Sequence, residues 1–358
     1  MEHKRILAIN PGSTSTKIAV YENEKNIFLK TLRHPAEMLS KYPKIIDQFD
    51  FRKEVIFEEL ESAQIDINTI NAVVGRGGLL KPVEGGVYEV NQLMIDDLKT
   101  GANGEHASNL GALIAFNIAQ SIPGAEAFIA DPVVVDELQD VARYTGHPMF
   151  ERRPIFHALN QRAIARTHAK TLNKKYEEIN LIIAHLGGGI SIGAHYKGRV
   201  IDVNNALDGE GPFSPERTGT LPAGPLAKLC FSGNYTLDQV KKMITGQGGL
   251  VAYLDTNDAY KVQMEAEAGD TKSKEIQDAM SYQIGKAIGE MAAVLKGKVD
   301  GILLTGGIAH NKVLVDYVRE MVEFIAPLTV YPGEDEMKAL AVNGLMALDK
   351  EIEIKVYQ

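Results

Sequence analysis

The sequence contains one cysteine, Cys230, and no tryptophan. A single cysteine excludes an internal disulfide bond and a metal site built from several thiolates. The apolar stretches fall short of the roughly 20 residues that a membrane-spanning helix needs. The chain also runs from Met1 almost directly into an apolar strand, without the pattern of a secretory signal. We therefore expect a cytoplasmic protein with no membrane partner.

Positive charge is also scarce, because 38 lysines and arginines stand against 47 aspartates and glutamates and leave a net charge of -9. A nucleic-acid-binding protein normally presents a basic face, so we expect no nucleic-acid partner. The chain lacks the motifs G-x-x-x-x-G-K-[ST] and G-x-G-x-x-G, which argues against a P-loop and a dinucleotide-binding fold. A polyanionic ligand would therefore have to be held by local groups.

The sequence does contain an alternating apolar pattern around a tip of small residues near its start. Apolar residues alternate between Ile6 and Tyr21, which predicts a β-hairpin. The tip of this hairpin, Gly12-Ser13-Thr14, would leave main-chain N–H groups and hydroxyls uncovered, and such groups suit a polyphosphate. An ordinary hairpin with a polar turn would share this pattern.

A second stretch repeats the same layout later in the chain. Residues 180–203 contain a buried strand, a tip of three glycines at 187–189 and a second strand. Another strand, at 300–305, leads into a pair of glycines. Two halves that each begin with a hairpin around a phosphate-sized tip indicate duplicated domains, as a length of 358 residues also does.

Periodicity and turn residues predict the remaining elements. In the first half they are strands at 26–33, 71–75 and 127–130 and helices at 39–63, 91–99 and 109–121. In the second half they are helices at 157–176, 308–324 and 337–348, a polar loop at 205–225, helices through 226–296 and a strand at 328–331. This order predicts mixed sheets with helices on their faces. From this order we expect a first domain at residues 1–152 plus 338–358 and a second domain at residues 153–337.

Six motifs in this order resemble the acetate/butyrate kinase (acetokinase) family, which belongs to a superfamily with sugar kinases, Hsp70-type chaperones and actin. The motifs are NPGSTSTK at 10–17, GRGG at 75–78, HLGGG at 185–189, SPERTG at 214–219, GGIA at 306–309 and GEDEM at 333–337. The resemblance covers nearly all of the chain. It implies an α/β fold of two duplicated actin-like (ribonuclease H-like) domains, each a mixed β-sheet with flanking helices, with an ATP cleft between them.

The resemblance also implies an activity: reversible, direct in-line transfer of the γ-phosphoryl group of ATP to a short-chain fatty acid, giving an acyl phosphate and ADP, with Mg²⁺. The first domain would bind the acid and the second the nucleotide, and the protein would form at least a dimer. The chemistry fits these expectations, because phosphoryl transfer needs positioning and charge neutralisation. A carboxylate, with a reference pKa of about 4, is already ionised and needs no general base.

The resemblance assigns catalytic roles to five residues. Arg76 would hold the substrate carboxylate, and Arg217 and His157 the transferring phosphoryl group. Asn10 would lie where nucleotide phosphate, metal and carboxylate meet. Asp131 would orient an arginine, whereas an aspartate there in a sugar kinase would be a general base.

The resemblance assigns binding roles to further residues. The expected nucleotide contacts are Gly12, Ser13, Thr14, Lys17, His185, Gly187, Gly188, Gly189, Gly306, Gly307 and Asn311. The expected acid contacts are Arg76, Gly77, Gly78 and His106. For magnesium we expect Asn10 and one carboxylate of the run Glu334-Asp335-Glu336, and we choose Glu336. That run would also be favoured simply by the dipole of the helix it opens.

The preferred acid is predicted from Gly77 and Gly78, where acetate kinases of the family usually carry small apolar side chains. Their absence would enlarge the pocket, and each buried methylene of a longer acid contributes about 0.8 kcal/mol. We therefore expect butyrate or a branched short-chain acid. The alternatives are an acetate or propionate kinase, a non-catalytic ATP clamp of the same superfamily, and a sugar kinase.

Overall fold

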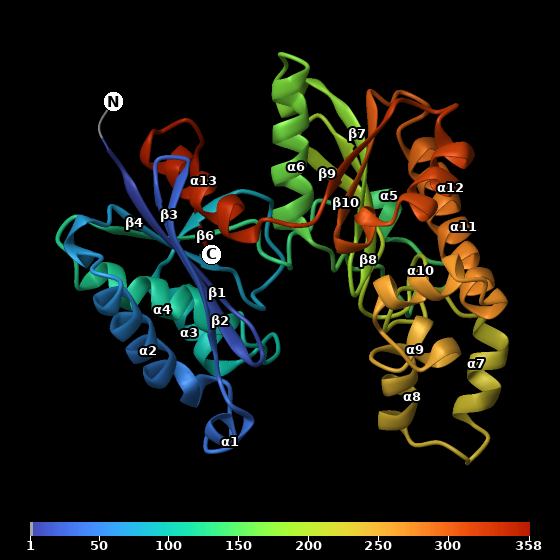
Figure 1. The fold of residues 1–358 in the computed structure, drawn as a ribbon, viewed down its shortest axis with the longest axis horizontal. Coiled ribbons are helices and arrows are strands. Elements are labelled where there is room, and N and C mark those ends of the chain that lie inside the picture. The colour runs from blue at the N-terminus through green and yellow to red at the C-terminus, as the bar shows by residue number, and fades with distance from the viewer. Residues whose placement is uncertain (1–2) are drawn as a thin grey trace. The chain divides into compact units, whose positions relative to one another are not determined.

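The computed structural model describes residues 3–358, which form two compact units (Figure 1). Unit 1 combines the chain up to Val135 with Asp335–Gln358, and unit 2 is Asp136–Glu334. The sequence pattern predicts these divisions at 152/153 and 337/338. Residues 136–152 instead join unit 2, because Gln139 N donates to Ile201 O at 3.0 Å and Arg152 Nη1 lies 3.0 Å from Asp202 Oδ1.

Unit 1 contains a seven-stranded sheet. Its strands are β1 (Arg5–Pro11), β2 (Ser15–Glu22), β3 (Lys25–Arg33), β4 (Ala72–Arg76), β5 (Val87–Glu89), β6 (Glu126–Ala130) and β12 (Ile354–Val356). They are ordered β12-β5-β6-β4-β1-β2-β3. The first three form an antiparallel meander, and β4 and β6 continue the sheet parallel to β1.

Unit 2 repeats this plan with five strands. They are β7 (Asn180–Leu186), β8 (Ile190–Tyr196), β9 (Arg199–Val203), β10 (Gly301–Gly306) and β11 (Leu328–Pro332), ordered β11-β10-β7-β8-β9. Here β7, β8 and β9 form the meander, and β10 and β11 run parallel to β7. The predicted duplication of a mixed sheet is confirmed.

Helices cover both faces of the sheet in unit 1 (Figure 1). The helices of this unit are α1 (Ala36–Leu39), α2 (Phe49–Ser62), α3 (Gln92–Thr100), α4 (Asn109–Gln120) and α13 (Glu336–Leu348). Leu7 and Ile9 share a core with α2 and α4, whereas Ile6 lies against Gly344 of α13 on the opposite face. This alternation follows from the two-residue period of a strand. As predicted, the terminal helix packs on the first sheet.

Unit 2 is layered in the same way. Its helices are α5 (Asp140–Arg143), α6 (Ala158–Thr171), α7 (Ala223–Cys230), α8 (Leu237–Ile244), α9 (Gly249–Leu254), α10 (Ala259–Glu267), α11 (Thr271–Val294) and α12 (Lys312–Val322). Leu181 and Ile183 face α6, while Ile182 and Ala184 face α11 and α12. Within residues 3–358, no helix has the length and apolarity needed to cross a membrane.

Several predicted elements differ from the structure at their ends. The helix expected at 39–63 is interrupted, because Pro43 disfavours helical geometry in the residue before it. A 3₁₀ turn, Ile46–Gln48, follows the proline and leads into α2. The helix expected at 308–324 opens with a 3₁₀ turn, Gly307–His310, before α12. The sequence does not predict β5 and β12, because strands this short show no period.

Candidate active site

In unit 1, three predicted site residues lie at one edge of the sheet. Ile9 of β1 is paired with Gly75 of β4, and Arg76 is paired with Ala130 of β6. These registers bring the carboxyl ends of three parallel strands together, and Asn10, Arg76 and Asp131 sit there. This edge is where ligands bind in open α/β sheets.

A network joins Asn10, Arg76 and Glu336 at this edge. Glu336 is the first residue of α13, and its Oε1 lies 2.8 Å from Arg76 Nη1. Asn10 Nδ2 donates to the other oxygen of Glu336, and Asn10 Oδ1 accepts from Arg76 Nη1 at 3.4 Å. Asn10 is buried, whereas the Arg76 side chain is partly exposed. The cluster therefore holds a partly exposed guanidinium in a fixed orientation.

The three carboxylates of the acidic run have different surroundings. Asp335 caps α13, since its Oδ1 accepts from Lys338 N at 2.9 Å. Glu334 belongs to unit 2, and Glu336 contacts Asn10. An amide oxygen and a carboxylate close together form a donor set that Mg²⁺ accepts, because this ion binds through one or two carboxylates together with water and phosphate oxygens. Asn10 and Glu336 fit that description, and their binding of magnesium stays a prediction.

Asp131 and His106 are both fixed by neighbouring main chain. Asp131, with a left-handed φ of 39°, accepts from Gly86 N at 2.8 Å through Oδ1. The predicted pairing of Asp131 with an arginine stays a prediction. His106 Nδ1 accepts from Ser108 N at 3.2 Å, so the neutral ring carries its proton on Nε2. Burial, reinforced by Arg76, lowers the pKa of His106 and keeps the ring neutral.

The glycines after Arg76 do not create the open space that the acid prediction assumed. A Cβ on Gly77 would lie 2.5 Å from Pro132 Cβ, and one on Gly78 would lie 2.5 Å from Asn109 Oδ1. These positions are filled by protein, so glycine here permits close packing. The argument that their missing side chains enlarge the acid pocket is therefore wrong. Contact of these two residues with the acid stays a prediction.

The first hairpin presents its tip to solvent. Ser13 and Thr14 are exposed between β1 and β2, while Thr16 is fully buried. Lys17 is also exposed and pairs with Asn10 across the two strands, so both side chains leave the same face. This placement is compatible with the predicted phosphate contacts.

In unit 2, the sheet again gathers candidate residues at the carboxyl ends of parallel strands. His185 of β7 is paired with Thr305 of β10, and Gly306 with Pro332 of β11. Glu334 follows two residues after β11. This edge therefore combines His185, the glycine pair and one carboxylate.

Two histidines meet Glu334 at this edge. His157 is the N-cap of α6, and its ring centroid lies 4.3 Å from that of His185. Glu334 Oε2 lies 3.2 Å from His157 Nε2 and 3.5 Å from His185 Nε2. The two histidines and the carboxylate are close enough together to hold a metal ion.

Asn160, which the sequence analysis missed, fixes the tautomers of both rings. Its main-chain N–H donates to His157 Nδ1 at 3.4 Å, so neutral His157 carries its proton on Nε2. Its Oδ1 accepts from His185 Nδ1 at 2.8 Å, which places that proton on Nδ1. A protonated Nε2 cannot bind a metal, so this arrangement favours His157 as a hydrogen-bond donor to an anion. The only signal for Asn160 in the sequence is its position three residues after His157, in the first turn of the expected helix.

The second glycine tip, Gly187–Gly189, is held by the long polar loop. Ser214 Oγ donates to Gly188 O at 2.7 Å, and Arg217 Nη1 donates to Ala206 O at 2.6 Å. A Cβ on Gly189 would lie 2.0 Å from Arg217 Nη1, so a side chain at this position would require the guanidinium to move. Burial lowers the pKa of Arg217, and two nearby carboxylates oppose this shift. The predicted arginine thus lies against the predicted tip.

The two glycines of the third motif have different surroundings: Gly306 is closely packed, and Gly307 borders open space. Gly306 has φ of 90°, and a Cβ there would lie 2.4 Å from Leu186 O. A Cβ on Gly307 would meet nothing within 4 Å. Asn311 is buried and caps α12, and its Nδ2 donates to Gln277 Oε1 at 2.8 Å. Its predicted nucleotide contact remains a prediction, although this amide already has structural partners.

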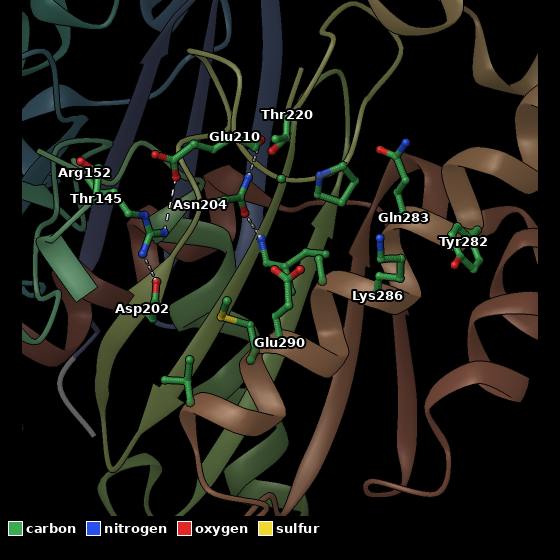
Figure 2. A pocket seen from close by; sticks show the side chains of 16 residues that line it. Thr145, Arg152, Asp202, Asn204, Glu210, Thr220, Tyr282, Gln283, Lys286 and Glu290 are labelled. Carbon is green, nitrogen blue, oxygen red and sulfur yellow. Dashed lines mark hydrogen bonds and ion pairs between the residues drawn. The ribbon is translucent and has the colours of Figure 1, made fainter. Parts of the chain in front are cut away.

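Unit 2 also contains a cavity of about 780 Å³ whose lining includes none of the predicted site residues (Figure 2). Arg152 forms two ion pairs: its Nη1 lies 3.0 Å from Asp202 Oδ1, and its Nη2 lies 3.4 Å from Glu210 Oε2. Asn204 Nδ2 donates to the main-chain oxygen of Glu210. Burial opposes the charge of Arg152, but the two carboxylates outweigh it and raise its pKa. These paired groups anchor the start of the loop that carries Arg217.

Comparisons with known proteins agree with this arrangement. A sequence model of the acetokinase family matches residues 139–344. The chain is 57% identical over 354 residues to a protein of Clostridium acetobutylicum named butyrate kinase 2, and the match covers 99% of each chain.

Two solved structures share the fold at low sequence identity. Porphyromonas gingivalis acetate kinase is 18% identical, with a TM-score of 0.79 over 96% of this chain and 99% of its own. A propionate kinase from Francisella tularensis is 18% identical, with a TM-score of 0.74 over 95% and 98%. These similarities confirm the fold expected from the motifs, two duplicated actin-like domains.

Proposed function

The chain belongs to the acetokinase family, and from this premise we propose that it transfers the γ-phosphoryl group of ATP reversibly to a short-chain fatty acid. We propose butyrate, or a branched acid of similar size, as the preferred acceptor. The observation that carries this preference is the 57% identity, across nearly the whole chain, to the protein named butyrate kinase 2. The packing of Gly77 and Gly78 removes the earlier structural reason for it.

In the reaction, a carboxylate oxygen of the acid attacks the γ-phosphorus of ATP. A P–O bond to the acyl group forms, the bond from the γ-phosphorus to the β,γ-bridging oxygen breaks, and ADP leaves with that electron pair. No proton has to be removed, because the acid is ionised near neutral pH. The protein therefore has to orient two anions and stabilise the charge on the transferring group.

Unit 1 supplies groups suited to the acid and the metal. Arg76 would bind the substrate carboxylate with donors that its Glu336 contact leaves over, because a guanidinium offers five. Neutral His106 would donate from Nε2. Asn10 and Glu336 would hold Mg²⁺, which neutralises phosphate charge when bound. Asp131, buried at the same sheet edge, would orient an arginine.

Unit 2 supplies groups suited to the nucleotide and the transferring phosphoryl group. His157 would donate from Nε2, which Asn160 keeps protonated. Arg217 would neutralise the equatorial oxygens of the γ-phosphoryl group from its place beside the second glycine tip. Gly307, which borders open space, leaves room for adenosine.

One assay tests this function. The purified protein is incubated with ATP, Mg²⁺ and one acid from a series of two to six carbons, and hydroxylamine traps any acyl phosphate. We expect trapped product from several acids and the highest kcat/KM with butyrate or a branched four-carbon acid. An equal or higher kcat/KM with acetate or propionate would transfer the proposal to those acids. No product from any acid, with ATP still bound, would support a non-catalytic ATP clamp, and phosphorylated sugar would support a sugar kinase.

Self-association is proposed as well, with at least two copies. Four large apolar side chains are exposed within one short segment of unit 2: Val141, Tyr144, Met149 and Phe150. Light scattering on a size-exclusion column should give at least twice the mass of one chain. A monomer at micromolar concentration would contradict this. We also propose the cytoplasmic location that is expected from the sequence.

A further inference from the structure

Arg52 is fully buried in unit 1, on α2. Its Nε and Nη2 donate to Gln48 Oε1 at 3.0 and 2.8 Å. Gln48 is a neutral partner, and no carboxylate within residues 3–358 forms an ion pair with Arg52. A buried cation without a counter-ion costs considerable desolvation energy, so its retention calls for a specific role.

The remaining donors of Arg52 are directed at the main chain of Gly12–Ser15, which is the first tip together with the first residue of β2. Nη1 donates to Gly12 O at 2.8 Å and to Ser15 O at 3.1 Å. Nη2 donates to Ser13 O at 3.1 Å. One guanidinium therefore binds three main-chain carbonyls of this segment from its protein side.

With these bonds, every carbonyl of the first tip has a donor. The fourth, Thr14 O, accepts from the main-chain N–H of His34 at 2.8 Å. In the part of the chain that the structure describes, the N–H groups of Ser13 and Thr14 have no acceptor, and both residues are exposed. The tip therefore points its partial negative charges inward and its partial positive charges outward, as an anion site requires.

The charge beneath the tip is a single positive one. Burial lowers the pKa of Arg52 to about 10, which leaves it charged at neutral pH. Burial, reinforced by Arg52, lowers the pKa of His34 to about 4, so this neighbour is neutral. Thr16 Oγ1 links the two, since it contacts His34 Nε2 at 2.9 Å and accepts from Arg52 Nη1 at 3.1 Å.

We propose that Arg52 is a positioning residue for the phosphates of ATP, which turns the carbonyls of the first tip away from them and adds a buried positive charge behind the tip. Arg52 acts through the tip and touches neither substrate. This inference rests on the proposed function, in which Ser13 and Thr14 contact nucleotide phosphate. A purely structural Arg52 would instead only fasten α2 to the hairpin.

Gln48→Glu separates these two roles. The substitution keeps the shape of Gln48 and gives Arg52 a carboxylate partner, so it cancels the charge behind the tip while strengthening the fastening. We expect ATP to bind about tenfold more weakly, because the unit charge behind the tip is neutralised. Adenosine, which has no phosphate, should bind within twofold of wild type, and the melting temperature should equal or exceed that of wild type.

Calorimetric titration with ATP, ADP and adenosine measures these affinities directly. Arg52→Lys, which keeps the charge but loses the planar fork, should also weaken ATP binding about tenfold and leave adenosine unchanged. Tyr357→Phe is the control, since it removes a buried hydroxyl of unit 1 that donates to Asp97 at 2.7 Å. It should lower the melting temperature without changing either affinity.

Unchanged ATP binding in Gln48→Glu, or an equal loss for adenosine, would overturn the inference. If Gln48→Glu does not fold, Arg52→Lys is judged by the same comparison of ATP with adenosine. These measurements need no turnover. A wild-type protein that binds ATP but forms no acyl phosphate would therefore refute the proposed function and leave the inference on Arg52 separately tested.

Discussion

The first strands of the two units end in the same way but deliver different chemistry. Asn10 stands two positions before Gly12 in β1, and His185 stands two positions before Gly187 in β7. Each lies beside the first turn of the helix on its face of the sheet. Asn10 contacts Glu336 of α13, and His185 contacts a residue in the first turn of α6. The duplicated scaffold thus presents one equivalent position in each unit.

The residues at these equivalent positions explain how one scaffold can serve two ligands. In unit 1, an amide and a carboxylate provide oxygen ligands beside Arg76, which suits a metal and an acid. In unit 2, the Nε2–H of His157 provides a hydrogen-bond donor beside the His185 ring, and Arg217 adds a cation, which suits a phosphoryl group. A helix N-terminus favours anions in both units. In α13, acidic side chains of the chain itself already occupy it.

The largest effect should come from Arg76→Ala in unit 1. Removing the guanidinium takes away the group proposed to bind the substrate carboxylate and leaves Glu336 without its cation, so kcat/KM for the acid should fall about a thousandfold. Most of the loss should appear in KM for the acid. Arg217→Ala in unit 2 is the matched variant and should lower kcat with little change in that KM. Steady-state kinetics with varied acid concentration measures both constants. If both variants mainly changed KM for the acid, or both mainly changed kcat, the separate roles of Arg76 and Arg217 would be contradicted.

Asn160→Ala in unit 2 should have the next largest effect. Without the side-chain amide, His185 loses the acceptor that holds its proton on Nδ1, whereas the main-chain N–H bound to His157 Nδ1 remains. We expect kcat to fall about tenfold to a hundredfold, as when an orienting partner of a functional histidine is lost. Asn160→Asp should accept from His185 and favour its protonated ring, which would move the pH–rate profile. The profile of each variant is the measurement that separates orientation from simple loss of structure.

The neighbouring Gln161 provides the control for Asn160. Gln161 Oε1 lies 2.9 Å from Nε2 of His195, a histidine buried in the core. Gln161→Met should lower stability but leave the shape of the pH–rate profile unchanged. A profile altered in this control and not in Asn160→Asp would reverse the roles assigned to the two side chains.

The sequence predicted local features of both units well and long-range ones poorly. The two tips and the duplication follow from alternation and glycine, which are visible within about 20 residues. The part played by Arg52 depends on a helix that passes beneath a tip 40 residues earlier in the chain, as the hydrogen bond to Gly12 shows. Gly77 and Gly78 were misinterpreted, because a missing Cβ does not indicate whether ligand or protein fills the space.

A buried neutral histidine in each unit predicts how stability depends on pH. Burial lowers the pKa of His34 in unit 1 to about 4, and burial together with Arg162 lowers that of His195 in unit 2 to about 3. The unfolded chain binds a proton at each ring near pH 6.5, so the stabilisation is complete above that pH. It should be lost as the pH falls toward 4 and 3 respectively, at about 1.4 kcal/mol per pH unit for each ring.

Urea unfolding at pH 7 and pH 5 checks this dependence. The variants His34→Gln and His195→Gln should both be less stable than wild type at pH 7, and each should lose less stability on going to pH 5. If the two variants keep the full wild-type dependence, other groups are responsible. A separate unfolding transition for each unit would show which histidine acts on which unit.

The smallest effect is expected from Ser214→Ala, which tests whether the two tips are held differently. The hydroxyl of Ser214 donates to Gly188 O and carries no charge, whereas Arg52 holds the first tip with a full positive charge. Loss of one neutral hydrogen bond should raise KM for ATP about threefold, compared with about tenfold for the Arg52 variant.

Ser281→Ala supplies the reference, because Ser281 is equally buried in unit 2 and its Oγ donates to Gln277 O at 2.8 Å, away from any tip. It should leave KM for ATP unchanged. A loss in Ser214→Ala as large as that in Arg52→Lys would mean that orienting the carbonyls, rather than placing a charge behind them, is what the two tips share. In that case the tips of β1–β2 and β7–β8 would bind phosphate in the same way, and the buried charge of Arg52 in unit 1 would need another explanation.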